Sequence, residues 1–439
     1  MELKKYKLGE ILDVTRGASL SGEFYATEGK YIRLTCGNFD YQNNCFKENK
    51  SKDNLYYIGD FKPEFLMEEG DIITPLTEQA IGLLGSTAII PESGKYIQSQ
   101  DVAKIICKEE LLDKDFVFYL ISSTLVKQQL SAAAQQTKIR HTSPDKIRDC
   151  TVWIPELTEQ KRIGKLLRSL DRKIELNRAI NQNLEAMAKQ LYDYWFVQFD
   201  FPNENGKPYK SSGGKMVWNE KLKREIPKGW NVLKLGEHCS FNKRTSNGYF
   251  NHPILYLDTS NITNNTIDEL QFLNPSSDII PSRARRLVQE GDIVYSTVRP
   301  NLKHFGIIMN PDYNMVVSTG FAVITANWSA YRYFIYQFLI QAATIENLST
   351  IAQSAVSAYP SINTSDIENL DLVVPPDSMI EKYAKTACRL YLQIDTNYKE
   401  IKSLTKQRDE LLPLLMNGQV SVNSDLSVYK KRRGKVPLL

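Results

Sequence analysis

Two long stretches of the chain carry apolar residues at a helical spacing. The core positions of 167–191 follow alternating steps of three and four residues, and the same steps recur in 387–411. This 3.5-residue period is typical of a coiled-coil seam. We therefore predict two long helices with seams formed by Leu167, Leu170, Ile174, Asn177, Asn181, Leu184, Ala188 and Leu191 in the first, and by Ala387, Leu390, Ile394, Asn397, Ile401, Leu404, Arg408 and Leu411 in the second.

The two predicted helices align with each other at an offset of 220 residues. Asn177 and Asn397 fall at the same place in the two seams, and a buried Asn in a coiled coil fixes the register at some cost in stability. Thr158 is the predicted N-cap of the first helix, and Asn417-Gly418 is the predicted stop of the second. Two matching seams favour pairing of the helices with each other over two helices that each pack on a separate domain.

Each predicted helix follows about 150 residues of short apolar runs broken by Gly, Pro, Asn and Ser. These runs predict short strands of a mixed α/β domain. Within each domain one longer apolar segment predicts a single helix, at 116–134 in the first and at 331–349 in the second. The strand-like runs are GDIITPL, STAII and DVAKIIC in the first domain, and GDIVYSTV, GIIM and FAVITA in the second.

The whole chain is a tandem repeat of domain and helix. Leu8-Gly9-Glu10 recurs as Leu235-Gly236-Glu237, and Glu69-Gly70-Asp71-Ile72 recurs as Glu290-Gly291-Asp292-Ile293. Ile154-Pro155 recurs as Val374-Pro375 ahead of the second helix. The offset drifts from 227 to 221 and then 220, in one direction, as loop deletions would produce. Between the units, 202–229 is rich in Gly, Pro, Ser, Lys and Asn and is predicted to be a linker.

The net charge does not by itself indicate a nucleic-acid binder. The chain has 55 Lys and Arg against 51 Asp and Glu, a net charge of +4. Five of these cations and one of these acids lie in 424–439, so the remaining chain carries 50 charges of each sign. Any DNA-binding surface must come from local clustering of cations, and the basic tail is expected to add at most non-specific phosphate contacts.

The remaining composition is that of a cytoplasmic protein without membrane spans. No run of 18 apolar residues is present, and the N-terminal residues lack the apolar core of a signal peptide. The six cysteines form no CxxC pair and no disulfide framework. His238 beside Cys239 could begin a zinc site, but no second pair of ligands accompanies it. We therefore expect no metal.

Several segments resemble a known family. The stretch IPELTEQKRIGKLLRSLDRKIELN (154–177) and the following residues 191–230 are similar to the first coiled-coil region of the specificity subunits of Type I restriction-modification enzymes. VVPPDSMIEKYAKTACRLYLQIDTN and RDELLPLLMNGQV resemble the C-terminal coil of the same family. The resemblance covers nearly the whole chain, including its repeat. The second unit departs from the family pattern, since it has SMIEK (378–382) where the first helix has TEQKRI (158–163).

The resemblance implies an α+β fold with two repeated mixed α/β target recognition domains, separated by two long antiparallel coiled-coil helices. It implies recognition domains at 1–156 and 230–376, helices at 157–201 and 377–418, the linker at 202–229 and a basic tail at 419–439. Each recognition domain would read one half of a bipartite site in double-stranded DNA. The implied partners are methyltransferase subunits and motor-nuclease subunits. Those partners would use S-adenosylmethionine, ATP and Mg²⁺, and this chain would bind no cofactor.

The sequence holds no clear catalytic motif. The Pro-Pro pair at 375–376 lacks the leading Asn or Asp and the following aromatic residue of an adenine methyltransferase, and no GxxxxGK[ST] loop is present. Asp145 with Glu159 and Lys161 matches the loose pattern of a metal-dependent nuclease. The alternative function is therefore a self-sufficient DNA methyltransferase or nuclease with fused recognition domains. A third possibility is a coiled-coil scaffold that never meets DNA.

Two loops in each unit carry the side chains that could contact DNA. Base edges are read by Arg, Lys, Asn, Gln, Ser and Thr, and phosphates by cations. The loop 296–304 offers two cations, whereas its counterpart 74–79 offers none, so the two halves should read different sequences. The second loop of each unit precedes the long helix. The candidate DNA-binding residues are Gln79, Gln135, Gln136, Lys138 and Arg140 in the first unit, and Thr297, Arg299, Asn301, Lys303, Gln353 and Tyr359 in the second.

Overall fold

The computed structural model describes residues 2–49, 53–78, 82–133, 140–354 and 360–422. Contacts divide the chain into two compact units, Met1–Leu176 with Glu400–Leu439, and Asn177–Lys399. The division falls within both long helices, α5 (Leu157–Tyr192) and α9 (Asp377–Met416), so each unit contains part of each helix. No helix in the described part of the chain is long and apolar enough to cross a membrane.

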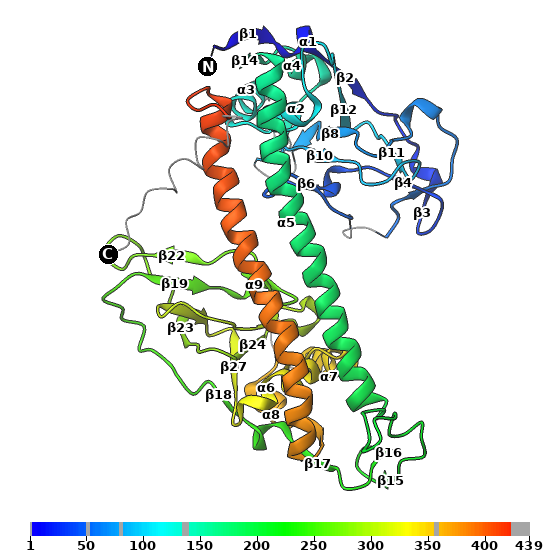
Figure 1. Cartoon of the computed structure of the whole chain (residues 1–439), viewed down its shortest axis with the longest axis vertical. Helices are drawn as coiled ribbons and strands as arrows, with labels where there is room; N and C mark the ends of the chain where they lie inside the picture. The colour runs from blue at the N-terminus through cyan, green and yellow to red at the C-terminus, as the bar shows by residue number, and fades with distance from the viewer. Residues whose placement is uncertain (1, 50–52, 79–81, 134–139, 355–359, 423–439) are drawn as a thin grey trace, which may run out of the picture. The chain divides into compact units, whose positions relative to one another are not determined.

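The two units contain corresponding sheets (Figure 1). Each has a four-stranded antiparallel sheet, a second four-stranded sheet with one parallel pair, and a two-stranded sheet that joins the start of the domain to its end. In unit 1 the sheets are β10 (Ala88–Ile89), β8 (Ile72–Pro75), β12 (Val102–Cys107) and β2 (Leu12–Arg16); β11 (Tyr96–Ile97), β4 (Tyr31–Arg33), β7 (Tyr56–Tyr57) and β3 (Tyr25–Ala26); and β1 (Lys4–Lys7) with β14 (Thr151–Ile154).

Unit 2 has three corresponding sheets: its antiparallel sheet has the same strand order, but the parallel pair lies in the middle of its second sheet instead of at one edge. They are β25 (Phe305–Ile307), β24 (Ile293–Ser296), β27 (Phe321–Ala326) and β18 (Cys239–Phe241); β22 (Gln271–Leu273), β19 (Ile254–Leu257), β26 (Met315–Ser318) and β23 (Ala284–Leu287); and β17 (Asn231–Lys234) with β28 (Asp371–Val374). Smaller pairs are β5 (Phe39–Asp40) with β6 (Cys45–Phe46) in unit 1 and β20 (Ile262–Thr263) with β21 (Thr266–Ile267) in unit 2. The predicted strands and the mixed α+β class are thus confirmed.

The repeated Glu-Gly-Asp motif forms the turn that opens the central strand of each antiparallel sheet. Gly70 and Gly291 have φ of +83° and +82°, a left-handed conformation that glycine adopts without strain. Asp71 and Asp292 each accept a hydrogen bond from the main-chain N–H three residues earlier, at 3.0 and 2.8 Å. The motif therefore recurs because both repeats need the same turn.

Each segment predicted as one helix is in fact two. In unit 1, α2 (Lys114–Ile121) and α3 (Thr124–Ala133) are separated at Ser122-Ser123. The Ser122 hydroxyl donates to the Phe118 carbonyl at 3.1 Å, and the Ser123 hydroxyl accepts from the Val126 N–H, so the serines compete with the main-chain ladder. In unit 2 the corresponding helices are α6 (Arg332–Leu339) and α7 (Ala342–Ser354). A short helix follows in each unit, α4 (Pro144–Arg148) and α8 (Thr364–Glu368).

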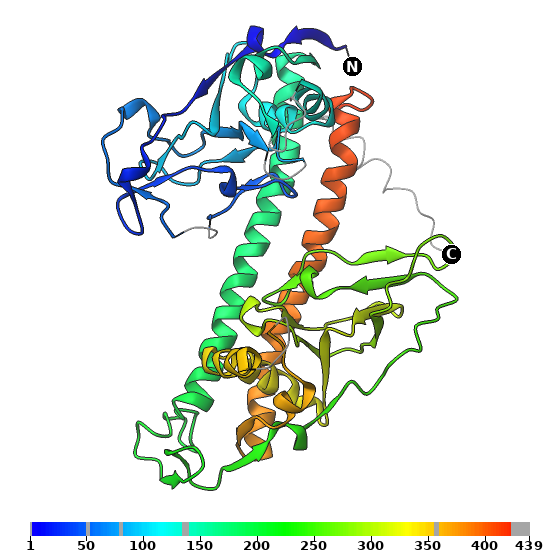
Figure 2. The ribbon, with the colours of Figure 1, turned by 180° about the vertical axis from the view of Figure 1, so that it is seen from behind.

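In each unit the helices α5 and α9 pack side by side and antiparallel (Figures 1 and 2). Asp171 binds Arg408 in unit 1, whereas Asn181 binds Asn397 in unit 2, so the partner number falls as the residue number rises. The α9 helix ends at Met416, and Gly418 has a φ of +70°, as the predicted stop requires. Helix α5 begins at Leu157, so Thr158 is not its N-cap: the Thr158 hydroxyl instead donates to the Glu156 carboxylate.

The buried face of the helices differs from the predicted seam at particular positions. Leu167, Ile174, Asn177, Ile394, Asn397 and Leu404 are buried, and Leu170, Leu184, Leu191, Leu390, Ile401 and Leu411 are only half-buried. The buried places next to Leu170, Leu191 and Leu390 are taken by Asp171, Tyr192 and Tyr391. A straight helix has 3.6 residues per turn, so its buried face moves one position along from a strict 3.5-residue pattern.

The buried Asn pair also differs from the sequence pattern. Asn397 donates to the Asn181 side chain at 2.8 Å, and Asn181 donates to the Ile394 carbonyl at 3.3 Å. Asn177 and Asn397 occupy equivalent places in the repeat but do not face each other. In an antiparallel pair the equivalent residues of two repeats lie at different levels, and the sequence offset does not show which residues meet.

The segment predicted as a linker holds a β-hairpin, β15 (Met216–Asn219) with β16 (Arg224–Pro227). Aromatic rings anchor the chain on either side of it: Phe201 stacks on Tyr209 and on Trp230, with ring centroids 4.6 and 5.1 Å apart. Ser211 donates from its N–H and its hydroxyl to Asp200. In 202–229 the Gly, Ser and Lys residues thus lie in turns, and the aromatic residues pack the segment together.

Candidate nucleic-acid interface

The candidate loop of unit 2 connects β24 to β25 and contains the short turn η7 (Pro300–Leu302). The residues on either side of this turn, Arg299 and Lys303, have φ of +48° and +58°. Non-glycine residues seldom adopt this left-handed conformation, and such strain persists where the surrounding structure holds it. Arg299, Asn301 and Lys303 are exposed, so the turn presents three of the predicted DNA-binding residues to solvent.

The second predicted segment of unit 2 lies against the same loop. The Arg299 N–H donates to the Pro360 carbonyl at 2.9 Å, and the Ile362 N–H donates to the Thr297 carbonyl at 2.9 Å. Helix α7, which carries the exposed Gln353, packs against η7. The structure therefore brings together two clusters that lie more than 50 residues apart in the sequence. Tyr359 lies outside the described residues.

Thr297, a predicted DNA-binding residue, uses its hydroxyl in a hydrogen bond within the protein. Its hydroxyl donates to the Gly320 carbonyl at 3.0 Å, and its N–H donates to the same oxygen at 2.9 Å. Thr319 in turn donates from its N–H to the carbonyl of Arg283, an exposed residue. Thr297 thus fixes the base of the loop, and the short connection 318–320 links the loop to a further cation.

A β-hairpin that the sequence analysis did not predict is hydrogen-bonded to the loop. Strands β20 and β21 are joined by Asn264-Asn265, with φ of +46° and +65°. The Asn264 N–H donates to the Lys303 carbonyl at 2.9 Å, and the Asn265 Oδ1 accepts from the Ile307 N–H at 2.9 Å. A Cβ on Gly306 would lie 2.6 Å from the terminal methyl of Ile262, so a larger residue there would displace this side chain. An Asn-Asn pair between two β-branched pairs, ITNNTI, is the signal that could have predicted this hairpin.

The hairpin also contacts both long helices within unit 2. Asn265 donates to the Glu185 carboxylate of α5 at 3.4 Å, and the Thr266 hydroxyl lies 3.0 Å from the Tyr398 hydroxyl of α9. Burial raises the pKa of Glu185 to about 7, and the hydrogen bond from Asn265 opposes this rise. The loop with Arg299 and Lys303 is therefore connected to the helices through one hairpin and the half-buried Glu185.

Glu185 predicts a pH dependence of stability. Its pKa in the folded chain, about 7, lies above the ordinary 4.5, so between these values the folded chain holds a proton that the unfolded chain releases. The free energy of unfolding should fall as the pH rises through this window. Glu185→Gln should remove that part of the slope and stabilise the chain at pH 8 by roughly 2 kcal/mol.

Urea denaturation at pH 4.5 and 8 measures this effect. The matched control is Glu175→Gln, which changes a more exposed acid on the same helix, paired with Arg168. Equal pH slopes for the wild type and Glu185→Gln would contradict the assignment.

The equivalent loop of unit 1 makes similar main-chain contacts but has an acidic residue, Glu78, at the place of Arg299. Strand β9 (Thr77–Glu78) pairs with β13 (Arg140–His141), and the Thr142 N–H donates to the Leu76 carbonyl, as Ile362 does to Thr297. At the 221-residue offset of the Glu-Gly-Asp motif, Glu78 stands where unit 2 has Arg299. Arg140 lies 3.6 Å from the buried Glu78 carboxylate, which also accepts the Gly82 N–H. Gln79, Gln135, Gln136 and Lys138 lie outside the described residues.

The residues of the alternative nuclease pattern do not form a metal site. Asp145 is exposed and pairs with Arg148, and Glu159 accepts the Val422 N–H from within helix α5. The Cys239 thiol donates to the Leu235 carbonyl. Within the described ranges, no group of three or more His, Cys, Asp or Glu side chains is placed to hold a metal ion.

Comparison with known proteins identifies the class of this fold. The profile described as "Type I restriction modification DNA specificity domain" matches residues 1–186 and 227–406, one match in each repeat. The chain therefore belongs to this family, as its resemblance predicted, and its role is to supply DNA sequence specificity.

Named relatives and one solved structure agree with that family. The chain is 25% identical to the Type I restriction enzyme MjaIX specificity subunit of Methanocaldococcus jannaschii over 334 residues, 74% of this chain and 73% of the relative. It is 28% identical to the HindI specificity subunit of Haemophilus influenzae over 171 residues, 38% of this chain and 36% of the relative. The crystal structure of the S subunit of a Type I restriction-modification system from M. genitalium shares the fold, with a TM-score of 0.55 at 16% identity, over 95% of this chain and 96% of that one.

Proposed function

We propose that the chain reads a bipartite site in double-stranded DNA, one half with each domain, and performs no chemistry itself. Methyltransferase subunits and motor-nuclease subunits would carry out adenine methylation and ATP-dependent cleavage, with S-adenosylmethionine, ATP and Mg²⁺ bound by those partners. The observation that supports two different half-sites is the exchange of Glu78 for Arg299 at one place in two equivalent loops. The exposed Arg299 guanidinium can reach the two acceptors of a guanine edge, whereas the Glu78 carboxylate is buried beside Arg140, so the two loops present different groups to DNA.

The loop of unit 2 would carry the readout in its half of the site. Arg299 is exposed and held in a strained conformation beside Asn301 and Lys303. Two of these side chains are cations, and Arg283 adds a third on the connected segment. In unit 1, Glu78 offsets the charge of Arg140, so readout there would depend less on cations.

Arg299→Ala should weaken DNA binding by roughly 1–3 kcal/mol and relax the sequence preference in one half of the target only. The half-site read by unit 1 should keep its preference. The measurement is binding of the reconstituted complex to duplexes randomised in one half-site at a time.

Arg299→Lys is the matched control because it keeps the charge and loses the bidentate geometry. A phosphate contact would survive this change, whereas a guanine contact would not. If Arg299→Ala leaves both half-site preferences unchanged, the loop does not read DNA. If the wild-type complex shows no sequence preference at all, the proposed function is wrong.

A further inference from the structure

A side-chain amide of unit 1 binds a strand edge whose counterpart has no such side-chain partner in the described part of unit 2. In unit 1, Gln129 on α3 faces Thr151 at the start of β14. The Gln129 Nε2 donates to the Thr151 carbonyl at 2.9 Å, and the Gln129 Oε1 accepts from the Thr151 N–H at 2.8 Å. The Leu8 N–H donates to the Cys150 carbonyl, so by the alternation of an antiparallel ladder the main-chain groups of Thr151 point away from β1. One carboxamide therefore satisfies an open strand edge.

Unit 2 presents the same strand edge without that carboxamide. The Leu235 N–H donates to the Leu370 carbonyl at 3.0 Å, so the main-chain groups of Asp371 on β28 likewise point away from β17. Helices α3 and α7 begin at Thr124 and Ala342, so the residue at the place of Gln129 is Asn347, which is one methylene shorter. No side chain in the described part of unit 2 takes the place of the Gln129 carboxamide.

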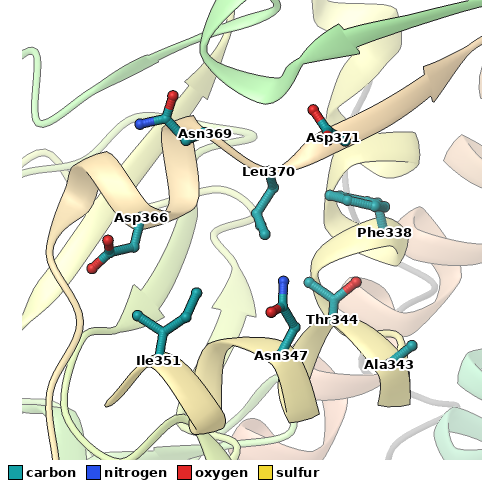
Figure 3. A pocket seen from close by; sticks show the side chains of 9 residues that line it. All are labelled: Phe338, Ala343, Thr344, Asn347, Ile351, Asp366, Asn369, Leu370 and Asp371. Carbon is teal, nitrogen blue, oxygen red and sulfur yellow. The ribbon is translucent and has the colours of Figure 1, made fainter. Parts of the chain in front are cut away.

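A cavity of about 390 Å³ lies between α7, α8 and β28 instead. In Figure 3, Asn347 and Leu370 point toward each other across it. Its lining combines apolar surface from Phe338, Ile351 and Leu370 with polar groups from Asn347, Asp366 and Asp371. The Asp371 carboxylate is already held by Lys221 and Lys234, at 2.6 and 2.7 Å, so the strand edge is fixed in place.

We propose that this cavity receives a glutamine or asparagine side chain from a methyltransferase subunit. A carboxamide offers one donor and one acceptor in the plane that the Asp371 main chain requires, as Gln129 demonstrates on Thr151. The apolar lining suits the methylene stem of such a side chain. This inference rests on the proposed function for the identity of the partner, and on the repeat for the chemistry of the occupant.

Asn347→Gln tests the proposal because it should fill the cavity from within, as in unit 1. Hydrogen exchange of the Asp371 amide should slow in the isolated variant to the rate of the Thr151 amide. Affinity for the methyltransferase subunit encoded with this chain should fall about tenfold, the effect of losing one to two hydrogen bonds. Asn347→Ala is the matched control, since it leaves the cavity open and should bind as the wild type does.

Ile351→Trp provides a second, bulkier way to fill the cavity. If both Asn347→Gln and Ile351→Trp bind the methyltransferase subunit as tightly as the wild type, the cavity does not dock it and the proposal is wrong. A loss of self-association instead would assign the cavity to a second copy of this chain and also overturn the proposal. If the wild-type chain itself does not bind the methyltransferase subunit, the proposed function is wrong. This outcome is distinguished by the wild-type measurement alone, without the variants.

Discussion

Asp171→Ala is expected to lower the free energy of unfolding of unit 1 by about 3 kcal/mol, because it leaves the buried Arg408 guanidinium with only the more exposed Asp409 as an ion-pair partner. Asp171 on α5 accepts hydrogen bonds from Arg408 on α9 and from Tyr119 on α2, and the side chains of Asp171 and Arg408 are 10% and 9% exposed. Burial raises the pKa of Tyr119, so this phenol stays protonated and donates. The carboxylate thus joins three elements at once.

The repeat suggests the compensating control. When α2 is aligned with α6 and the long helices at their 220-residue offset, the equivalent places in unit 2 hold Gln337, Tyr391 and Ala188, and Gln337 donates to the Tyr391 hydroxyl at 2.8 Å. The triple variant Tyr119→Phe, Asp171→Leu, Arg408→Met should therefore recover stability to within about 1 kcal/mol of the wild type, since apolar side chains often replace a buried ion pair without loss. Denaturation followed by circular dichroism gives the stability, and hydrogen exchange assigns it to unit 1. A single variant as stable as the wild type would show that the pair contributes nothing.

Asp292→Ala is expected to cost about 3 kcal/mol in unit 2, because three hydrogen bonds to one fully buried carboxylate are lost together. Asp292 accepts from Arg244 and Thr325, both at 2.7 Å, and from the Gln289 N–H at 2.8 Å. Its side chain is 1% exposed. Loss of this turn should also loosen β24, which leads directly into the Arg299 loop, so DNA readout in that half-site should weaken as well.

The equivalent change in unit 1 is the matched control. Asp71 accepts from Lys104 and from the Glu68 N–H, with its side chain 13% exposed, so water can replace part of what Asp71→Ala removes. We expect a smaller cost, on the order of 1–2 kcal/mol. Thermal and chemical denaturation of both variants compare the two turns directly. A larger loss for Asp71→Ala than for Asp292→Ala would mean that burial does not set the contribution of this motif.

Local patterns in the sequence were enough to predict the repeat, the long helices and the class of the fold. A helical period is a property of neighbouring residues, and the Glu-Gly-Asp turn depends on a glycine φ and on a carboxylate three residues from its donor. The charge difference between 74–79 and 296–304 was visible for the same reason. These features need no knowledge of which distant segments meet.

Only the tertiary structure decided which of these segments lie together. It joined Thr297 and Arg299 to 360–362, placed the Asn264-Asn265 hairpin under Lys303, and paired Asn397 with Asn181 instead of Asn177. It also buried Asp171 in place of Leu170, because Arg408 and Tyr119 supply partners that a hydrophobic pattern does not reveal. Asn347 is one methylene shorter than Gln129, and only the position of the strand edge beside it shows that this difference leaves a cavity. Each of these outcomes depends on contacts between residues far apart in the chain, and a sequence pattern records only the spacing along it.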